Sequence, residues 1–145
     1  MQCDRKWIAA HIPHQGSMCL LDMVELWNKN EIVCSTSSHR FPDNPLRANG
    51  ALGIGNGIEY AAQAMAVHGA LLADQNEAPA VGYLTSVRDV HWQRTRLDDI
   101  SSDLTIRAER ISGNNINILY NFAVLAEGAT LLTGRASVML NTGNL

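Results

Sequence analysis

Three polar side chains interrupt a segment of the sequence that is otherwise apolar. The segment runs from Gly57 to Leu72 and holds Glu59, Gln63 and His68. Its many alanines and its lack of proline predict a helix of about four turns, and apolar residues on almost every face predict that this helix is buried. Glu59 and Gln63 share one face, one turn apart. An ionisable group in a buried helix is either paired or used in chemistry. Glu59 is therefore the first candidate for a catalytic residue, and a structural carboxylate is the alternative.

A second candidate group lies in the irregular segment of residues 39–56, which leads into this helix. The segment contains Pro42 and Pro45 together with several glycines. Long loops without regular structure are uncommon inside a compact domain and are often functional. His39 is the first residue of the segment, and histidine titrates near neutral pH, as a general base must. The alternative is that His39 is an ordinary histidine in a surface loop.

The rest of the pattern predicts the elements that position these groups. Residues 4–11 predict a short amphipathic helix, with Asp4 as its N-terminal cap. Residues 18–27 and 31–38 predict a hairpin. Four further apolar segments predict consecutive antiparallel strands, arranged as a meander, over residues 81–92, 104–111, 116–125 and 131–140.

A sheet that must cover one apolar helix curls around it, and this architecture is called the hotdog fold. The predicted class is therefore α+β, with a curved antiparallel sheet wrapped around one long central helix. The length of 145 residues suits a single hotdog domain over residues 1–145. The open edge of such a sheet commonly pairs across a dimer.

Composition and charge exclude several classes of function. The net charge of −3 argues against a protein that binds nucleic acid. No apolar run reaches the roughly 18 residues that span a bilayer. The N-terminus lacks the apolar core of a signal peptide, so we expect a cytoplasmic protein. Cys3, Cys19 and Cys34 form no C-x-x-C pair, and clustered zinc ligands are missing from the sequence. We expect neither a metal nor another cofactor.

Four segments, in this order along the chain, resemble the hotdog-fold 3-hydroxyacyl-(acyl carrier protein) dehydratases. The similarity is greatest to a divergent branch associated with aryl-polyene biosynthesis. Residues 12–24 are similar to the family's P-H-x-x-P-x-L-L-x-D-x-V opening, and residues 39–45 are similar to its H-F-P-G-x-P loop. Glu59-x-x-Ala62-Gln63 matches the family's E-x-x-A-Q on the central helix. Residues 87–99 resemble the strand and turn that follow.

The resemblance implies the dehydration of a 3-hydroxyacyl thioester. A base removes the proton α to the thioester, and an acid protonates the leaving β-hydroxyl group. The resemblance assigns the acid to Glu59 and the base to His39. The second assignment departs from the family pattern, because Arg40 stands where the family has its loop histidine and His39 lies one position earlier. Backbone N–H groups near Gly57 and Ile58 are expected to stabilise the developing enolate.

Further residues are expected to bind the substrate. Gln63 lies one turn after Glu59 and can fix its carboxyl group by a hydrogen bond. His14 is expected either at the substrate entrance or in a structural role, and Arg47 can neutralise a phosphate of the carrier arm. The expected partners are an acyl carrier protein and a second subunit, in a homodimer or in a heterodimer with a related hotdog subunit.

Two alternatives to a dehydratase stay open at this point. The same helix carboxylate serves hotdog thioesterases, in which it activates or orients a water molecule. The altered histidine loop also fits a non-catalytic subunit that binds acyl chains and supports a partner dehydratase.

Overall fold

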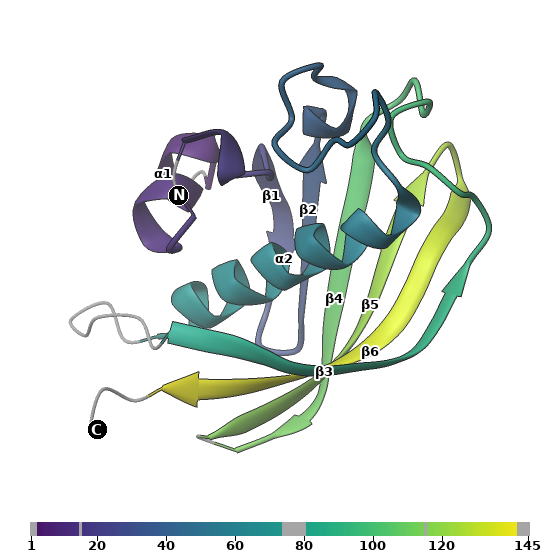
Figure 1. Cartoon of the computed structure of the whole chain (residues 1–145). Coiled ribbons are helices and arrows are strands. Elements are labelled where there is room, and N and C mark those ends of the chain that lie inside the picture. Colours follow the sequence, from purple (N-terminus) through teal and green to yellow (C-terminus); the bar gives the residue numbers. More distant parts are fainter. Residues whose placement is uncertain (1–2, 15, 74–80, 115, 142–145) are drawn as a thin grey trace.

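A long helix, α2, lies across the concave face of one curved antiparallel sheet (Figure 1). The structure is a computed structural model, and it describes residues 3–14, 16–73, 81–114 and 116–141. Short 3-10 turns lie at Gly16–Met18, Ser38–Arg40 and Ile54–Asn56. Over the described residues the helices and strands are α1 (Arg5–His11), β1 (Met23–Trp27), β2 (Glu31–Thr36), α2 (Gly57–Leu72), β3 (Val81–Trp92), β4 (Leu104–Gly113), β5 (Asn117–Ala126) and β6 (Ala129–Asn141).

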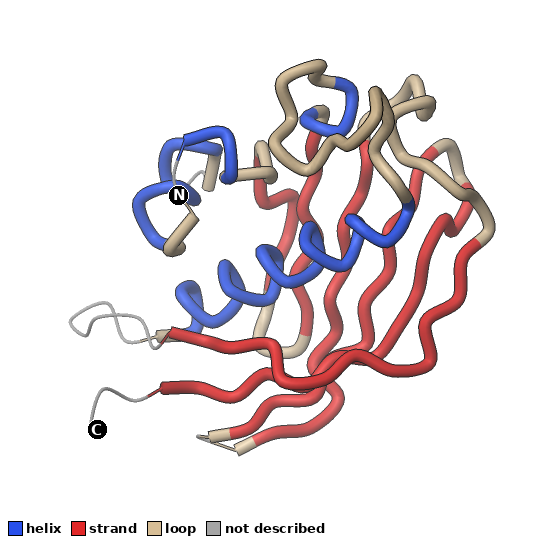
Figure 2. The backbone as a smooth tube through the Cα atoms, viewed as in Figure 1, coloured by secondary structure: helices blue, strands red, loops and turns tan. Residues whose placement is uncertain are grey.

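The strands follow the order β1-β2-β4-β5-β6-β3 in the sheet, and every neighbouring pair is antiparallel. β5 and β6 are joined by Glu127 and Gly128, whose φ angles are 56° and 74°. A two-residue turn with positive φ at both positions matches the right-handed twist of the strands it joins. The predicted meander is wrong at its first strand, because β3 pairs with β6 while β4 pairs with β2. Residues 93–103 instead carry the chain from one edge of the sheet to its centre (Figure 2).

The inner face of the sheet forms the core with α2. On β4 the side chains of Leu104, Ile106 and Ala108 are buried, while those of Arg107 and Glu109 are exposed. Successive side chains of a strand point to opposite faces of the sheet. The alternation in the sequence is therefore the alternation between core and solvent.

α2 approaches the sheet closely at its first residue, Gly57. A Cβ atom at this position would lie 2.6 Å from Leu132 Cδ2 and 3.3 Å from Val124 Cγ2. Such distances are shorter than ordinary van der Waals contact, so a side chain here would have to displace the side chains of Leu132 and Val124. The first turn of α2, which includes Glu59, is thereby fixed against the sheet.

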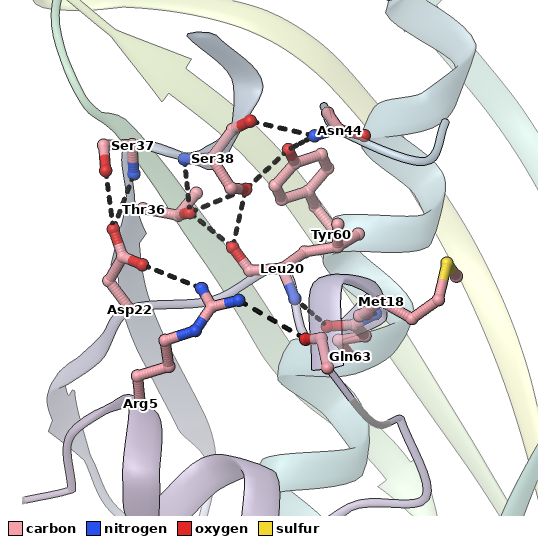
Figure 3. Close-up of polar contacts among 11 residues, drawn as sticks. Arg5, Met18, Leu20, Asp22, Thr36, Ser37, Ser38, Asn44, Tyr60 and Gln63 are labelled. Carbon is pink, nitrogen blue, oxygen red and sulfur yellow. Dashed lines mark hydrogen bonds and ion pairs between the residues drawn. The ribbon is translucent and has the colours of Figure 1, made fainter. Parts of the chain in front are cut away.

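The segment before β1 hydrogen-bonds to α2 instead of joining the sheet. Gln63 Oε1 accepts a hydrogen bond from the backbone N–H of Leu20 at 2.9 Å, and Gln63 Nε2 donates to the carbonyl oxygen of Met18 at 2.7 Å (Figure 3). The predicted strand of residues 18–27 therefore begins only at Met23. The predicted helix before it is confirmed as α1, and Asp4 caps it by accepting a hydrogen bond from the backbone N–H of Trp7 at 3.0 Å.

A buried polar network ties this segment to β2 and to α2 (Figure 3). The hydroxyl groups of Thr36 and Ser38 both donate to the carbonyl oxygen of Leu20, with a distance of 2.7 Å for Ser38. Ser38 Oγ also lies 2.8 Å from the hydroxyl of Tyr60, to which Asn44 Nδ2 donates at 3.1 Å. The network continues toward the surface through Ser37, Asp22 and Arg5.

In the part of the chain that the structure describes, no helix is both long enough and apolar enough to cross a membrane. Within the same residues, no group of three or more histidine, cysteine, aspartate or glutamate side chains is placed to hold a metal ion.

Candidate active site

A cavity of about 510 Å³ lies between α1, α2 and the inner face of the sheet. Its wall on α2 is made by Glu59, by Met65 and by small residues, among them Ala62 and Ala66. Tyr83 of β3 and Tyr120 of β5 contribute to the opposite wall. The lining is mostly apolar, so the cavity suits a hydrocarbon chain with a polar group at one point.

An acid and an imidazole meet in this cavity. His14 Nε2 lies 3.3 Å from Glu59 Oε1, and both side chains line the cavity. The two side chains are 27% and 37% exposed, so that a substrate can reach them. His14 Nδ1 is buried and has no hydrogen-bond partner within the described residues. A carboxyl group and an imidazole in contact can accept one proton and donate another, which is the requirement of general acid–base catalysis.

Secondary structure explains how the two groups come together. Glu59 stands in the first turn of α2. His14 follows α1, in the segment whose later residues are hydrogen-bonded to α2 through Gln63. Glu59 and Gln63 thus share a face of one helix, and each contacts the N-terminal segment.

Gln63 bonds to backbone atoms of the N-terminal segment and not to the carboxyl group of Glu59, so the predicted contact between the two side chains is wrong. Its side chain is fully buried, and both of its polar atoms bond to the backbone of Met18 and Leu20. Gln63 therefore positions the segment that carries His14.

His39 is not in this cavity. Its side chain is fully buried, and its Nε2 lies 3.0 Å from the carbonyl oxygen of Ile100, to which it donates a hydrogen bond. Burial lowers the pKa of His39, so that the neutral imidazole is favoured. The structure therefore does not bring His39 to Glu59, and it places another histidine, His14, there instead.

The irregular segment before α2 is held against the connection between β3 and β4. The backbone N–H of Leu97 donates to the carbonyl oxygen of Leu52 at 2.7 Å, and that of Ile54 donates to the carbonyl oxygen of Thr95 at 3.0 Å. Asp98 Oδ1 accepts a hydrogen bond from the backbone N–H of Leu52 at 2.8 Å. Of the described residues, none from 39 to 56 lines the cavity. The length of this loop therefore reflects packing against a second loop.

The other expected binding residues also lie outside the cavity. Gly57 packs against Leu132 and Val124, so its lack of a side chain serves helix–sheet packing. Ile58 is half-buried and packs against the core. Arg47 Nη1 and Nη2 lie 3.4 Å from the carbonyl oxygens of Gly50 and His39, respectively, within its own loop.

One wall of the cavity contains a polar pair, His68 and Tyr120, that the sequence did not predict. His68 Nδ1 lies 2.7 Å from the hydroxyl of Tyr120, and His68 Nε2 lies 2.7 Å from the carbonyl oxygen of Asn28. Burial lowers the pKa of His68 and raises that of Tyr120 to about 12, so both groups are neutral. Nε2–H then donates to the carbonyl oxygen, and the tyrosine hydroxyl donates to Nδ1. These bonds give both ring nitrogens of His68 a partner. Side chains alternate between the two faces along β5, and this alternation makes Tyr120 an inward-facing residue. It was the signal in the sequence for the place of Tyr120 in this wall.

A second hollow, of about 340 Å³, is lined by charged side chains, including Asp89, Arg107, Glu109 and Arg135. Arg107 is already paired with Glu109 at 3.3 Å and with Glu31 at 3.0 Å. Exposed pairs of this kind contribute little energy and are common on protein surfaces. The cavity with His14 and Glu59 is therefore the stronger candidate for an active site.

Comparison with known proteins gives a family for nearly the whole chain. A family model described as "ApeP-like: ApeP dehydratase" matches residues 6–144. No curated protein matches the sequence.

Solved structures share the fold. A chain of the dehydratase heterocomplex ApeI:P from Xenorhabdus doucetiae has a TM-score of 0.81 and 23% identity, over 93% of this chain and 91% of that chain. A mutant thioesterase from Pseudomonas aeruginosa has a TM-score of 0.67 and 16% identity, over 94% and 93% of the two chains. Zebra fish thioesterase superfamily member 2 has a TM-score of 0.65 and 14% identity, over 94% and 95%. These likenesses confirm the predicted hotdog fold.

Proposed function

The chain belongs to the ApeP-like dehydratase family, and we propose that it converts 3-hydroxyacyl thioesters to trans-2-enoyl thioesters, with His14 and Glu59 as the reacting pair. Family membership confirms the sequence-based prediction of a dehydratase. The contact between His14 Nε2 and Glu59 Oε1, in a cavity that is otherwise mostly apolar, supports the choice of this pair. We further propose that an acyl carrier protein delivers the substrate, in a fatty-acid-like or aryl-polyene pathway, as the resemblance implies.

The pair supplies both proton transfers of the reaction. Neutral His14 takes the proton from the α carbon, and the electrons of the broken C–H bond pass into the enolate of the thioester. Glu59, as a carboxylic acid, gives its proton to the β-hydroxyl group. The C–O bond then breaks, water leaves, and the new C=C bond forms. The products of these steps are an imidazolium and a carboxylate, and their contact of 3.3 Å gives a direct path for the proton to return.

The proposal includes a second subunit of related fold on the β3 edge of the sheet. β3 pairs with β6 and ends the strand order, and it exposes Tyr83, Leu84 and Trp92 by 53%, 42% and 59%. Large apolar side chains on an open edge are typical of an interface between subunits. Tyr83 and Leu84 also line the cavity, so a subunit at this edge would help to close it. The related ApeI:P dehydratase is described as a heterocomplex, which supports a heterodimer, and a homodimer is the alternative.

A cytoplasmic location is also part of the proposal. Cys3, Cys19 and Cys34 are buried and free, as is usual for proteins in a reducing compartment. Fractionation of cells that express the tagged chain tests this location.

The proposed reaction is tested by turnover of a 3-hydroxyacyl carrier-protein substrate by the purified chain, beside the variants Glu59→Gln and His14→Gln. Each variant keeps the size of the side chain and removes its ability to transfer the proton. We expect each to lower the rate of dehydration by about 100-fold or more, with little change in melting temperature. His91→Gln is the matched control, because His91 is exposed on β3 and does not line the cavity.

The outcomes separate the remaining alternatives. Release of the free acid by the wild type would show a thioesterase. The folded chain alone could show no turnover and gain activity only after co-expression of a second hotdog subunit that keeps its own catalytic groups. This result would show that the chain is a supporting subunit. Full activity in either variant would remove that residue from the mechanism.

A further inference from the structure

α2 contains a second glycine, Gly69, that neither the backbone nor the packing of the protein requires. It lies in the last turns of the helix, where the backbone is α-helical. Among the described residues, a Cβ atom at Gly69 would meet no atom within 4 Å apart from its own stretch of helix, whereas a Cβ atom at Gly57 would meet Leu132 Cδ2 at 2.6 Å. Glycine inside a helix costs about 1 kcal/mol relative to alanine. Glycine at position 69 therefore leaves open volume beside the helix.

That volume belongs to the candidate active site. Gly69 lines the cavity, together with Glu59, Ala62, Met65 and Ala66 of α2. From Glu59 to Gly69 the helix rises about 15 Å. The cavity thus follows α2 away from the reacting pair past Ala62, Ala66 and Gly69, with the larger side chain of Met65 beside them. The small residues leave room for a chain that lies parallel to the helix.

The opposite wall restricts the chemistry of such a chain. The hydroxyl of Tyr120 is engaged by His68 Nδ1 at 2.7 Å, so the tyrosine offers mainly its ring to the cavity. Val138 and Ile118 line the cavity on the neighbouring strands. These groups favour an unbranched apolar or conjugated chain and disfavour a charged group near its end. A length of about 15 Å accommodates an extended chain of roughly twelve carbon atoms.

We propose that Gly69 sets the length of acyl chain that the protein accepts, with the end of the chain remote from the thioester lying over Gly69. The inference rests on the proposed function, because it takes the thioester to lie at His14 and Glu59. A side chain at position 69 would point into the end of the cavity and shorten it. Chains that end before this point would not contact the new side chain.

The test compares Gly69→Leu with Gly69→Ala and with Ala70→Leu. Ala70 is the next residue on α2 and does not line the cavity, so Ala70→Leu is the matched control for added volume. The substrates are the carrier-protein thioesters of 3-hydroxybutyrate, 3-hydroxyoctanoate and 3-hydroxydodecanoate. We expect Gly69→Leu to lower kcat/KM for the dodecanoyl substrate by about tenfold or more and to change that for the butyryl substrate by less than about twofold. Ala70→Leu should leave the ratio of the two unchanged.

Binding measurements separate this inference from the proposed reaction. Calorimetric titration with the non-reacting butyryl and dodecanoyl thioesters of pantetheine reports chain length without turnover. Selective loss of dodecanoyl binding in Gly69→Leu would support the role of Gly69 even if the wild type dehydrated no substrate, in which case the proposed function alone would fail. An equal effect on both chain lengths, or no effect on either, would overturn the role of Gly69. A folded Gly69→Ala variant with a raised melting temperature shows that the helix tolerates substitution at this position.

Discussion

At the scale of single residues, the histidines of this chain differ by what surrounds them. His14 lies beside a carboxyl group and lines a cavity, whereas His39 and His68 are fully buried and hydrogen-bonded to backbone carbonyl groups. The residue type alone does not distinguish these three histidines. Only the environment makes one of them suitable for proton transfer and the others suitable for holding loops in place.

The two buried histidines should make the stability of the protein depend on pH. Burial lowers the pKa of His39 and of His68 from the ordinary value of 6.5. Because the unfolded chain then binds protons more readily than the folded one, the stabilisation is complete above about pH 6.5 and is lost as the pH falls toward the folded pKa values. We expect the free energy of unfolding, measured with urea, to decrease below pH 6.5.

The variant His39→Gln tests the origin of this decrease. It should be less stable than the wild type at neutral pH, since the hydrogen bond to Ile100 is disturbed, and its stability should decline less steeply below pH 6.5. His91→Gln, at an exposed position, should keep the slope of the wild type. An unchanged slope in His39→Gln would show that this histidine does not contribute to the pH dependence.

At the scale of elements, α2 is held by a close packing contact at Gly57 and by a polar clamp, the two hydrogen bonds of Gln63. Gly57 brings its first turn against β5 and β6, and Gln63 fixes the segment of Met18 and Leu20 to its side. Together they determine where Glu59 stands and where the chain that contains His14 can run. Both are needed because the two reacting groups come from different segments of the sequence.

Replacement of Gly57 by alanine should destabilise the protein although alanine favours helices. The new Cβ atom would lie 2.6 Å from Leu132 Cδ2, and overpacking of this kind costs about 1–3 kcal/mol. Gly69→Ala should instead increase stability by up to about 1 kcal/mol, because only the helix propensity changes. Chemical denaturation of the two variants checks this difference in sign. Equal effects on stability would contradict the packing role of Gly57.

Replacement of Gln63 by leucine should weaken both stability and catalysis. It leaves the backbone N–H of Leu20 and the carbonyl group of Met18 without their partner, at a cost of about 2–4 kcal/mol. Because this clamp positions the segment that follows His14, kcat should fall more than KM rises. Gln93→Leu, at an exposed position, is the control. A variant with lowered stability but unchanged kcat would limit Gln63 to a structural role.

At the scale of the whole molecule, each inner strand of the sheet is hydrogen-bonded to a neighbour on both sides, and the two edge strands are bonded on one side only. β1 forms one edge and is short, with five residues. β3 forms the other edge with twelve residues, and it presents Tyr83, Leu84 and Trp92 to solvent. A long apolar edge favours association, and a short edge favours it less.

Replacement of Leu84 by lysine should separate the subunits, because it places a charge on the proposed interface at β3. We expect the apparent mass in solution, measured by light scattering after size exclusion, to fall toward that of one chain. Leu26→Lys, at an exposed position on β1, is the control and should not alter the mass. An unchanged mass in Leu84→Lys would place the interface elsewhere.

The sequence by itself determined the elements that depend on local pattern. The alanine-rich, proline-free composition predicts α2 over Gly57–Leu72, and the apolar residues between two turns predict β3 over Val81–Trp92. Both elements have these bounds in the structure. The central position of one apolar helix then leaves few ways to arrange the sheet, so the hotdog fold could also be predicted from the sequence. Glu59 could be selected because a carboxyl group in such a helix is unusual.

The tertiary structure alone decided which groups meet. The pairing of β4 with β2, the inward direction of Tyr120 beside His68, and the approach of His14 to Glu59 all join residues far apart in the chain. Local pattern has no information about such contacts, because they depend on how loops and bulges direct whole elements in space. His39 and His14 are equivalent by residue type, and only the path of the chain brings His14 into the cavity.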